Sequence, residues 1–299
     1  MANQIDLMIV GAQKAGTTSL NNYLAQHPNI FTHFTLEFNM FRSPEDFKKG
    51  FQYYMDNTVE KKIQSDPDKI KFVAKRVGIM HDIKMLNQLK EHNPDVKIIV
   101  VLRNPIDRAF SAFGYSRKTG REPLENFLEA IKQNESGFDR FNGNIYLQRA
   151  CDYIGRSKYV ESLGNIYSIF PEKNVSVFLF EEMIKDYSVF LNKMAVSLGI
   201  KKYAFDTTKT YNEAGNIKNE MLAKTLAPGQ MKFFKGILPL KYRVKLKQFL
   251  KSKNSTKSDK KIMPPETRSQ LIQIFKEDVR HLNENYNIPV LSFWPEYFK

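Results

Sequence analysis

The residue types best suited to chemistry stand close together near the start of the chain, in the segment GAQKAGTTS that covers residues 11–19. An apolar run, residues 5–10, precedes it, and a helical pattern begins at Thr17. At such a strand-to-helix turn, backbone N–H groups converge on an anion, and the helix dipole and the Lys14 ammonium add to the attraction. The segment therefore predicts a site for a nucleotide or another phosphate ester, with an ordinary strand-to-helix turn as the alternative.

The spacing within this loop bears on which nucleotide it binds. A P-loop NTPase has the pattern G-x-x-x-x-G-K-[ST], in which the lysine follows the second glycine. Here Gly11 and Gly16 keep that offset, but Thr17 occupies the lysine position and the lysine lies within the loop, at Lys14. Without a lysine on the β- and γ-phosphates, a kinase or NTPase loses its main clamp. The loop thus favours a nucleotide with one anionic group on its 5′ side, and a P-loop kinase or NTPase is the alternative.

A second motif, LRNPIDRAFS at residues 102–111, follows the strongest apolar run of the chain. Arg103 comes at the end of that run, and Ser111 comes about two turns into the next expected helix. A guanidinium and a hydroxyl can both hydrogen-bond one phosphate group. A nucleotide phosphorylated at both its 5′ and 3′ positions would satisfy the two motifs together. The alternative is an Arg103 in a structural salt bridge and a Ser111 on a helix surface.

The elements that must hold these motifs alternate between strand and helix. Strands are expected at residues 5–10, 70–74, 96–102 and 175–180, and helices at residues 17–26, 82–91, from 106 onward, 181–198 and 265–285. Such alternation predicts an α/β fold with a parallel sheet, helical insertions and a helical C-terminal region. Ligands bind at the carboxyl ends of parallel strands, so we expect the two motifs and residues 74–76 to converge on one edge. Without a repeat or a clear linker, the prediction is a single domain over residues 1–299.

Together, the two motifs resemble those of PAPS-dependent sulfotransferases, in the bacterial branch that is similar to heparan sulfate and other carbohydrate sulfotransferases. The segments that carry the resemblance are AQKAGTTSL at 12–20 and VVLRNPIDRAFSAF at 100–113, with weaker matches at 27–30, 37–41, 175–183 and 265–294. The resemblance implies a P-loop-type parallel sheet. It also implies PAPS as the sulfuryl donor, 3′,5′-ADP (PAP) as the product, and no metal. The acceptor would be a hydroxyl or amine, most simply on a carbohydrate.

The resemblance also assigns residues to roles by position. The 5′-phosphosulfate would lie against six residues of the loop: Lys14, Ala15, Gly16, Thr17, Thr18 and Ser19. Arg103 and Ser111 would hold the 3′-phosphate. The family motif E-K-S-P is represented here by AKRV at 74–77, which makes Lys75 a candidate second lysine near the sulfuryl group. Lys218, in the polar segment 211–222, is a candidate for a basic loop over the nucleotide, with an exposed turn as the alternative.

The general base has two candidates. Glycan sulfotransferases carry K-E-x-x-x-F after the loop helix, and its glutamate takes the proton of the acceptor. This chain has Leu36 in place of the lysine, followed by Glu37 and, four residues on, Phe41. Glu37 is therefore the favoured base. His33 is the alternative, because small-molecule sulfotransferases generally use a histidine.

Charge and composition restrict the partners. The chain has 299 residues, 42% of them hydrophobic, and a net charge of +14 from 46 Lys/Arg against 32 Asp/Glu. This favours anionic ligands, either an acidic glycan as acceptor or the doubly phosphorylated donor itself. A small hydroxylated metabolite is the alternative acceptor. Lysines concentrate at 232–261, where a solvated helix face, an acidic acceptor groove and a peripheral membrane contact all remain open. A nucleic-acid-binding module is the alternative from another class, but the chain has no aromatic-rich basic repeat, and we expect no nucleic-acid partner.

The remaining composition bears on location and metals. Cys151 is the single cysteine, so no disulfide can form within the chain, and a cytoplasmic location is expected. No apolar run approaches the roughly 18 residues of a membrane span, and the first residues lack the pattern of a signal peptide. The five histidines are scattered, so no metal cluster is expected.

Overall fold

The computed structural model describes residues 4–59, 71–208, 215–217, 255–257 and 263–299. The chain forms two compact units. Unit 1 comprises Met1–Arg103, Val160–Asn212 and Ile288–Phe293, and unit 2 comprises Asn104–Tyr159, Glu213–Asn287 and Trp294–Lys299. Each unit is described by itself.

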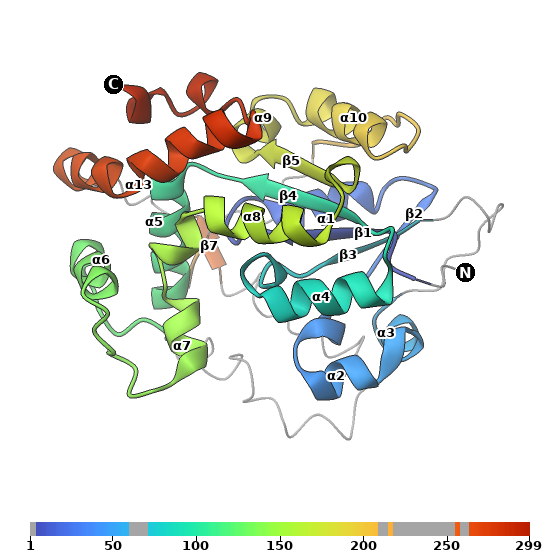
Figure 1. Cartoon of the computed structure of the whole chain (residues 1–299), viewed down its shortest axis with the longest axis horizontal. Coiled ribbons are helices and arrows are strands. Elements are labelled where there is room, and N and C mark those ends of the chain that lie inside the picture. The colour runs from blue at the N-terminus through green and yellow to red at the C-terminus, as the bar shows by residue number, and fades with distance from the viewer. Residues whose placement is uncertain (1–3, 60–70, 209–214, 218–254, 258–262) are drawn as a thin grey trace. The chain divides into compact units, whose positions relative to one another are not determined.

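Unit 1 contains a five-stranded sheet of the order β2-β3-β1-β4-β5, and the strands lie side by side in Figure 1. Its strands are β1 (Leu7–Gly11), β2 (Ile30–Thr32), β3 (Lys71–Lys75), β4 (Lys97–Leu102) and β5 (Val175–Leu179). All neighbouring strands are parallel. The prediction of an α/β fold with a parallel sheet is therefore confirmed.

The central strands are apolar because both of their faces are covered. Every residue of β1 is buried, and so are all residues of β4 after Lys97. In register, Ile9 of β1 lies opposite Lys75 of β3 and Ile99 of β4. The carboxyl ends of these three strands therefore meet at one edge of the sheet. This confirms the expected convergence of the glycine loop, residues 74–76 and the start of the second motif.

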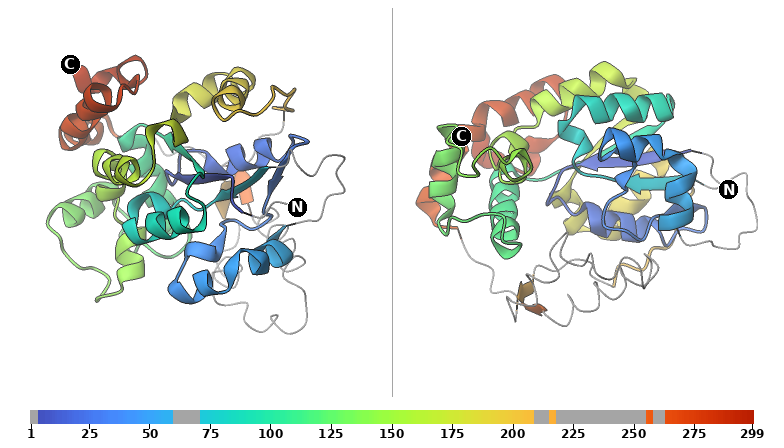
Figure 2. Two further views of the ribbon diagram at one scale, coloured as in Figure 1. Left: turned by 45° about the vertical axis from the view of Figure 1, so that its right-hand side comes forward. Right: turned by 90° about the horizontal axis from the view of Figure 1, so that it is seen from below.

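Seven α-helices complete the regular structure described for unit 1: α1 (Thr17–Leu24), α2 (Pro44–Lys48), α3 (Gly50–Thr58), α4 (Ile83–His92), α8 (Val160–Ile169), α9 (Phe180–Lys185) and α10 (Tyr187–Ser197). Helix α1 packs against β1, β2 and β3, and α4 packs against α8, as the turned views of Figure 2 show. Short 3-10 turns occur at Asn39–Phe41, Ile79–His81, Glu172–Asn174 and Val290–Ser292.

Two details of unit 1 differ from the sequence-based prediction. The helix expected over 181–198 is two helices, because Asp186 adopts an extended backbone and its side chain accepts the Val189 N–H, which caps α10. Strand β2 was not predicted, since three residues leave too short a pattern to show alternation.

Unit 2 is mainly helical in the part that the structure describes. Its helices are α5 (Pro105–Lys118), α6 (Phe127–Glu135), α7 (Ile145–Ala150) and α13 (Pro265–Tyr286), with 3-10 turns at Gly155–Ser157 and Pro295–Phe298. The predicted helical insertions and helical C-terminal region are thereby confirmed. Strands β6 (Gly215–Ile217) and β7 (Ser255–Lys257) form a small antiparallel pair. Lys218 and most of the lysine-rich stretch 232–261 lie outside the described residues.

Candidate active site

The glycine loop joins β1 to α1 at the carboxyl edge of the sheet. The N–H of Ala12 donates to the carbonyl of Val101 on β4 at 2.8 Å, which fixes the start of the loop. Lys14 and Gly16 then take left-handed backbone conformations, with φ values of 71° and 75°. Alternation into this region turns successive N–H groups toward one side of the chain, and α1 begins directly afterwards, with no acidic residue in its first turn. The loop thus has the backbone form of an anion site at a helix N-terminus.

Position 16 requires glycine for two separate reasons. Its positive φ is unfavourable for a residue with a side chain. In addition, a Cβ at this position would collide with the Met183 methyl group and lie 2.9 Å from the Phe180 ring. Helix α9 therefore packs directly on the loop backbone, which keeps the loop close to the sheet.

Arg103, from the second motif, contacts the glycine loop directly. Its guanidinium donates to the carbonyl oxygen of Lys14 at 3.0 Å and lies 4.8 Å from the centroid of the Phe180 ring. Both contacts are internal to unit 1, so the end of β4 supports the loop directly. The predicted partner of Arg103, Ser111, is a half-buried residue of α5 in unit 2.

Helix α5 is held firmly within unit 2. The Asn104 side chain accepts the N–H groups of Ile106 and Asp107 and so caps the helix, and Pro105 follows at its first position. The buried Arg108 donates to the Ser157 hydroxyl at 2.5 Å and to the Tyr153 carbonyl at 2.8 Å. The two arginines of the motif therefore have different surroundings: Arg103 lies against the loop, and Arg108 is a structural residue.

Glu37 and Lys75 form an ion pair beside the end of β3. The Lys75 ammonium and Glu37 Oε1 are 2.7 Å apart, and Glu37 Oε2 accepts the Val77 N–H at 2.9 Å. The Lys75 side chain is 2% exposed and the Glu37 side chain is 24% exposed, so the carboxylate is the member of the pair that solvent reaches. A second bond, from the Phe38 N–H to the Lys75 carbonyl at 2.8 Å, holds the two segments together. The structure thus brings together two of the predicted site residues.

His33 lies beneath this pair and is buried. Its Nε2 accepts the backbone N–H of Lys75 at 3.1 Å, so its Nδ1 carries the proton and donates to the Thr35 hydroxyl at 2.9 Å. The Thr35 hydroxyl in turn donates to the Glu37 carbonyl. Burial, and next the charge of Lys75, lower the pKa of His33 to about 3. His33 is therefore a neutral residue with both ring nitrogens in use.

Two groups at this site were not indicated by sequence reasoning. The Val77 N–H is a backbone donor, which no residue type signals. Arg76 was expected at this edge of the sheet but was given no role there. It donates to the Asn39 side chain at 2.8 Å, while its Nε is buried without a hydrogen bond. Burial lowers the pKa of Arg76, and the carboxylate of Glu37 opposes this effect. Arg76 therefore adds a second cation to the surroundings of Glu37.

Leu36 and Phe41, the motif positions on either side of Glu37, differ in their exposure to solvent. Leu36, at the position of the family lysine, is 58% exposed. Phe41 is fully buried. Among the described residues, no group of three or more His, Cys, Asp or Glu is arranged to hold a metal ion. No helix in the described ranges is both long and apolar enough to cross a membrane.

The chain is similar in sequence to known proteins. The sequence profile described as "Sulfotransferase domain" matches residues 4–283. The bifunctional heparan sulfate N-deacetylase/N-sulfotransferase 1 of Caenorhabditis briggsae is 22% identical over 210 residues, which are 68% of this chain and 23% of that protein. The human bifunctional heparan sulfate N-deacetylase/N-sulfotransferase 2 is 32% identical over 127 residues, 40% of this chain and 14% of its own length. The chain thus spans about a quarter or less of these relatives.

A solved structure supports the fold. The crystal structure of a sulfotransferase from Alicyclobacillus acidocaldarius superposes with a TM-score of 0.64 at 20% sequence identity, covering 95% of this chain and 96% of that one. Together with the profile match over both units, the parallel sheet and the glycine loop, this leads to one conclusion. The chain belongs to the sulfotransferase-domain family.

Proposed function

We propose that this protein transfers a sulfuryl group from PAPS to a hydroxyl or amine of an acceptor, most simply a carbohydrate, with Glu37 as the general base. The observation that carries the proposal is the meeting of three features at one edge of the unit 1 sheet. These are the glycine loop, the Arg103 guanidinium on the Lys14 carbonyl, and the Glu37–Lys75 pair. The single-domain organisation over 1–299 remains part of the proposal.

PAPS supplies a sulfur atom bonded to a phosphate oxygen that can leave with the bonding electron pair. On the protein side, the loop from Lys14 to Ser19 would bind the 5′-phosphosulfate through its backbone N–H groups and hydroxyls. The Lys14 ammonium would stabilise the negative charge that grows on the leaving oxygen, and Lys75 would be a second lysine near the sulfuryl group. Arg103 and Ser111 would hold the 3′-phosphate. Most of the catalysis would then come from positioning and charge stabilisation, as in phosphoryl transfer.

Glu37 is better suited than His33 to accept the proton of the acceptor. Its carboxylate is partly exposed, and its two hydrogen bonds leave lone pairs that can take a proton. His33 is buried, its one acceptor nitrogen already receives the Lys75 N–H, and its low pKa makes it a weak base. The geometry therefore supports Glu37 as the base. It supports His33 as a residue that holds the segment from Thr35 to Glu37 in place.

The acceptor is proposed from the named relatives and from the charge of the chain. The named relatives act on heparan sulfate, and the net charge of +14 favours an acidic glycan over a neutral one. A small hydroxylated metabolite is the second acceptor class, and a P-loop kinase or NTPase is the second reaction. The cytoplasmic location remains a prediction from the single cysteine, and Lys218 remains a proposed contact to the nucleotide.

Calorimetry with 3′,5′-ADP, ADP and ATP–Mg²⁺ tests the donor. We expect a preference for 3′,5′-ADP that falls in Arg103→Ala and Ser111→Ala. Ser111→Ala is the cleaner variant, since Arg103 also supports the loop. Equal or tighter binding of ATP would contradict PAPS as the donor and favour a P-loop kinase or NTPase.

Turnover tests the base. With PAPS and a glucuronate–glucosamine oligosaccharide, Glu37→Gln should lower kcat roughly 10²–10⁴-fold and leave 3′,5′-ADP binding unchanged. His33→Gln should keep most of the activity. If His33→Gln lost the activity and Glu37→Gln kept most of it, His33 would be the base. Comparing the free amine with its N-acetylated form would separate N- from O-sulfation.

A further inference from the structure

Arg76 follows the last residue of β3 and has a guanidinium that is only partly satisfied by the protein. Its backbone N–H donates to the carbonyl of Ile9 on β1 at 3.0 Å, so its main chain is fixed to the edge of the sheet. Its Nη1 donates to the Asn39 side chain at 2.8 Å, but its Nε is buried without a hydrogen-bond partner among the described residues. A buried charged donor without an acceptor is unfavourable for folding. Stability alone therefore does not account for an arginine at this position.

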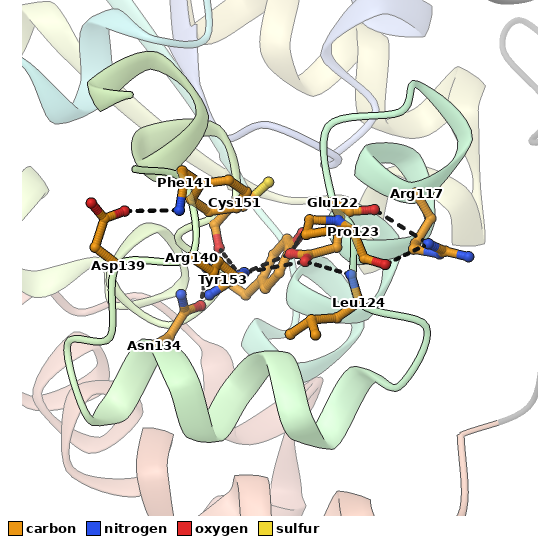
Figure 3. Close-up of polar contacts among 10 residues, drawn as sticks. All are labelled: Arg117, Glu122, Pro123, Leu124, Asn134, Asp139, Arg140, Phe141, Cys151 and Tyr153. Atoms are coloured by element: carbon orange, nitrogen blue, oxygen red, sulfur yellow. Dashed lines mark hydrogen bonds and ion pairs between the residues drawn. The ribbon is translucent and has the colours of Figure 1, made fainter. Parts of the chain in front are cut away.

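Arg140 of unit 2 provides the contrast, because its surroundings are those of a structural arginine. Figure 3 shows the fully buried Glu122 carboxylate accepting the Arg140 guanidinium at 2.8 and 3.1 Å. The same carboxylate accepts the Tyr153 hydroxyl at 2.8 Å. The charge of Arg140 is thus balanced by a carboxylate in direct contact, whereas Arg76 is bonded to a neutral amide.

Three consecutive residues at the end of β3 hold two residues of the segment that contains the proposed base. The Lys75 ammonium and the Val77 N–H contact the Glu37 carboxylate at 2.7 and 2.9 Å. Arg76 lies between these two residues in the sequence and contacts Asn39, two residues after Glu37. The bond to Asn39 therefore fixes the chain on the far side of the base and limits its movement relative to β3.

The charge of Arg76 also acts on Glu37. Burial lowers the pKa of Arg76, and among the neighbouring charges the Glu37 carboxylate opposes this effect most strongly. The other charged groups nearby form a cluster of their own, in which Asp46 pairs with Arg42 at 2.6 Å and with Lys49 at 2.7 Å. The Arg42 side chain is 60% exposed, so solvent screens its charge.

We propose that Arg76 is a positioning residue for the Glu37 base. It holds residues 37–39 against the end of β3, and its charge keeps the carboxylate ionised while a bound acceptor excludes water. His33 beneath the carboxylate is neutral, so Arg76 adds the second positive charge after Lys75. The inference rests on the proposed function, in which Glu37 takes the proton of the acceptor. Arg76 stands where the family pattern E-K-S-P has a serine, so the role is specific to this chain.

The first measurement is the titration of Glu37 itself, which needs no acceptor. NMR of the full chain with isotope-labelled glutamate follows the carboxyl signal that disappears in Glu37→Gln. In Arg76→Gln the midpoint of this titration should move to higher pH, because a charge that favours the carboxylate is removed. Arg76→Lys keeps the charge and should stay close to the wild type. Arg117→Gln is the matched control, since Arg117 is a half-buried arginine of α5 that donates to the Pro123 carbonyl.

The second measurement is turnover with PAPS and the glucuronate–glucosamine oligosaccharide. Arg76→Gln should lower kcat about tenfold or more through displacement of the base, and leave the KM for PAPS unchanged. Asn39→Ala removes the same hydrogen bond and keeps the charge, so it should lower kcat without moving the titration midpoint. In Glu37→Gln the base is already absent, and adding Arg76→Gln should change kcat by less than about twofold. Urea unfolding checks that each variant is folded.

Three results would overturn the inference: an unchanged titration of Glu37 in Arg76→Gln, an equal shift in Arg117→Gln, or effects that multiply fully in the double variant. Full activity in Glu37→Gln would refute the proposed base and the inference with it. Loss of activity in Glu37→Gln together with full activity in Arg76→Gln would refute the inference alone.

Discussion

Replacing His33 with glutamine should change how the stability of this protein depends on pH. In the folded protein His33 is 3% exposed, and burial together with the Lys75 charge lowers its pKa to about 3. In the unfolded chain the pKa returns to about 6.5. Below about pH 6.5 the unfolded state therefore binds a proton that the folded state does not bind. The free energy of unfolding therefore decreases as the pH is lowered below about 6.5, and it continues to decrease until about pH 3.

The size of the effect follows from the two pKa values. Between pH 7 and pH 5, an unfolded histidine gains about 0.7 of a proton, while His33 in the folded protein gains almost none. Integrating that difference gives a loss of about 2 kcal/mol for the wild type over these two pH units. In His33→Gln the side-chain amide can still accept the Lys75 N–H but cannot titrate. The stability gap between wild type and variant should accordingly shrink by about 2 kcal/mol from pH 7 to pH 5.

Urea unfolding of both proteins at pH 7 and pH 5 measures this gap. Taking the difference removes the contributions of the other titrating groups, including His27 and His92, whose pKa values burial also lowers. The NMR signal of the His33 ring gives a second measure, identified by its loss in the variant. It should show no titration above about pH 4. Parallel stability curves for the two proteins, or a ring that titrates near pH 6.5, would refute the assignment of His33 as a buried neutral residue.

Three further substitutions test the structure at other points. Gly16→Ala should lower the affinity for 3′,5′-ADP by about tenfold or more. The added Cβ is unfavourable at this left-handed backbone and collides with Met183 and Phe180, so the loop must shift. Unchanged affinity in calorimetry would contradict this. Arg140→Met should lower the free energy of unfolding by about 3–5 kcal/mol, since it leaves the Glu122 charge buried and unpaired. Adding Glu122→Gln should restore part of that loss in urea unfolding, and a double variant less stable than the single one would count against the argument. Asp186→Ala should cost about 1 kcal/mol through loss of the α10 cap, with no loss expected if α9 and α10 formed one helix.

The sequence predicted most of unit 1 because its signals are local. β1 and β4 are uninterrupted apolar strands, and the glycine loop and the Arg-Asn-Pro turn follow them directly. Parallel pairing then puts strand ends at one edge by geometry alone. This reasoning could not predict strand β2 or the interruption between helices α9 and α10 at Asp186. β2 is held by its pairing with β3, and the break depends on a capping bond that competes with an unbroken helical pattern.

The sequence identifies the candidate bases by residue type and not by protonation. Glu37 and His33 lie four residues apart, and both types can accept a proton, so the sequence left both open. Burial separates them, since it withdraws His33 from solvent and leaves Glu37 partly exposed. The contacts that cause this separation come from Lys75 and Thr35. No pattern in the sequence indicates that a strand amide at position 75 will occupy the one acceptor nitrogen of a histidine at position 33.

Leu36 stands at the position where glycan sulfotransferases have a lysine, and the cation that contacts Glu37 in this chain is Lys75. Leu36 is exposed and brings no charge, yet the neighbouring Glu37 carboxylate has the Lys75 ammonium at 2.7 Å, supplied by β3. Because Lys75 is itself buried, the pair is stable only if Glu37 stays close. The Lys75 ammonium and the Val77 N–H together hold the Glu37 carboxylate in place. The loss of one cation from the motif therefore does not leave Glu37 without the partner that orients it.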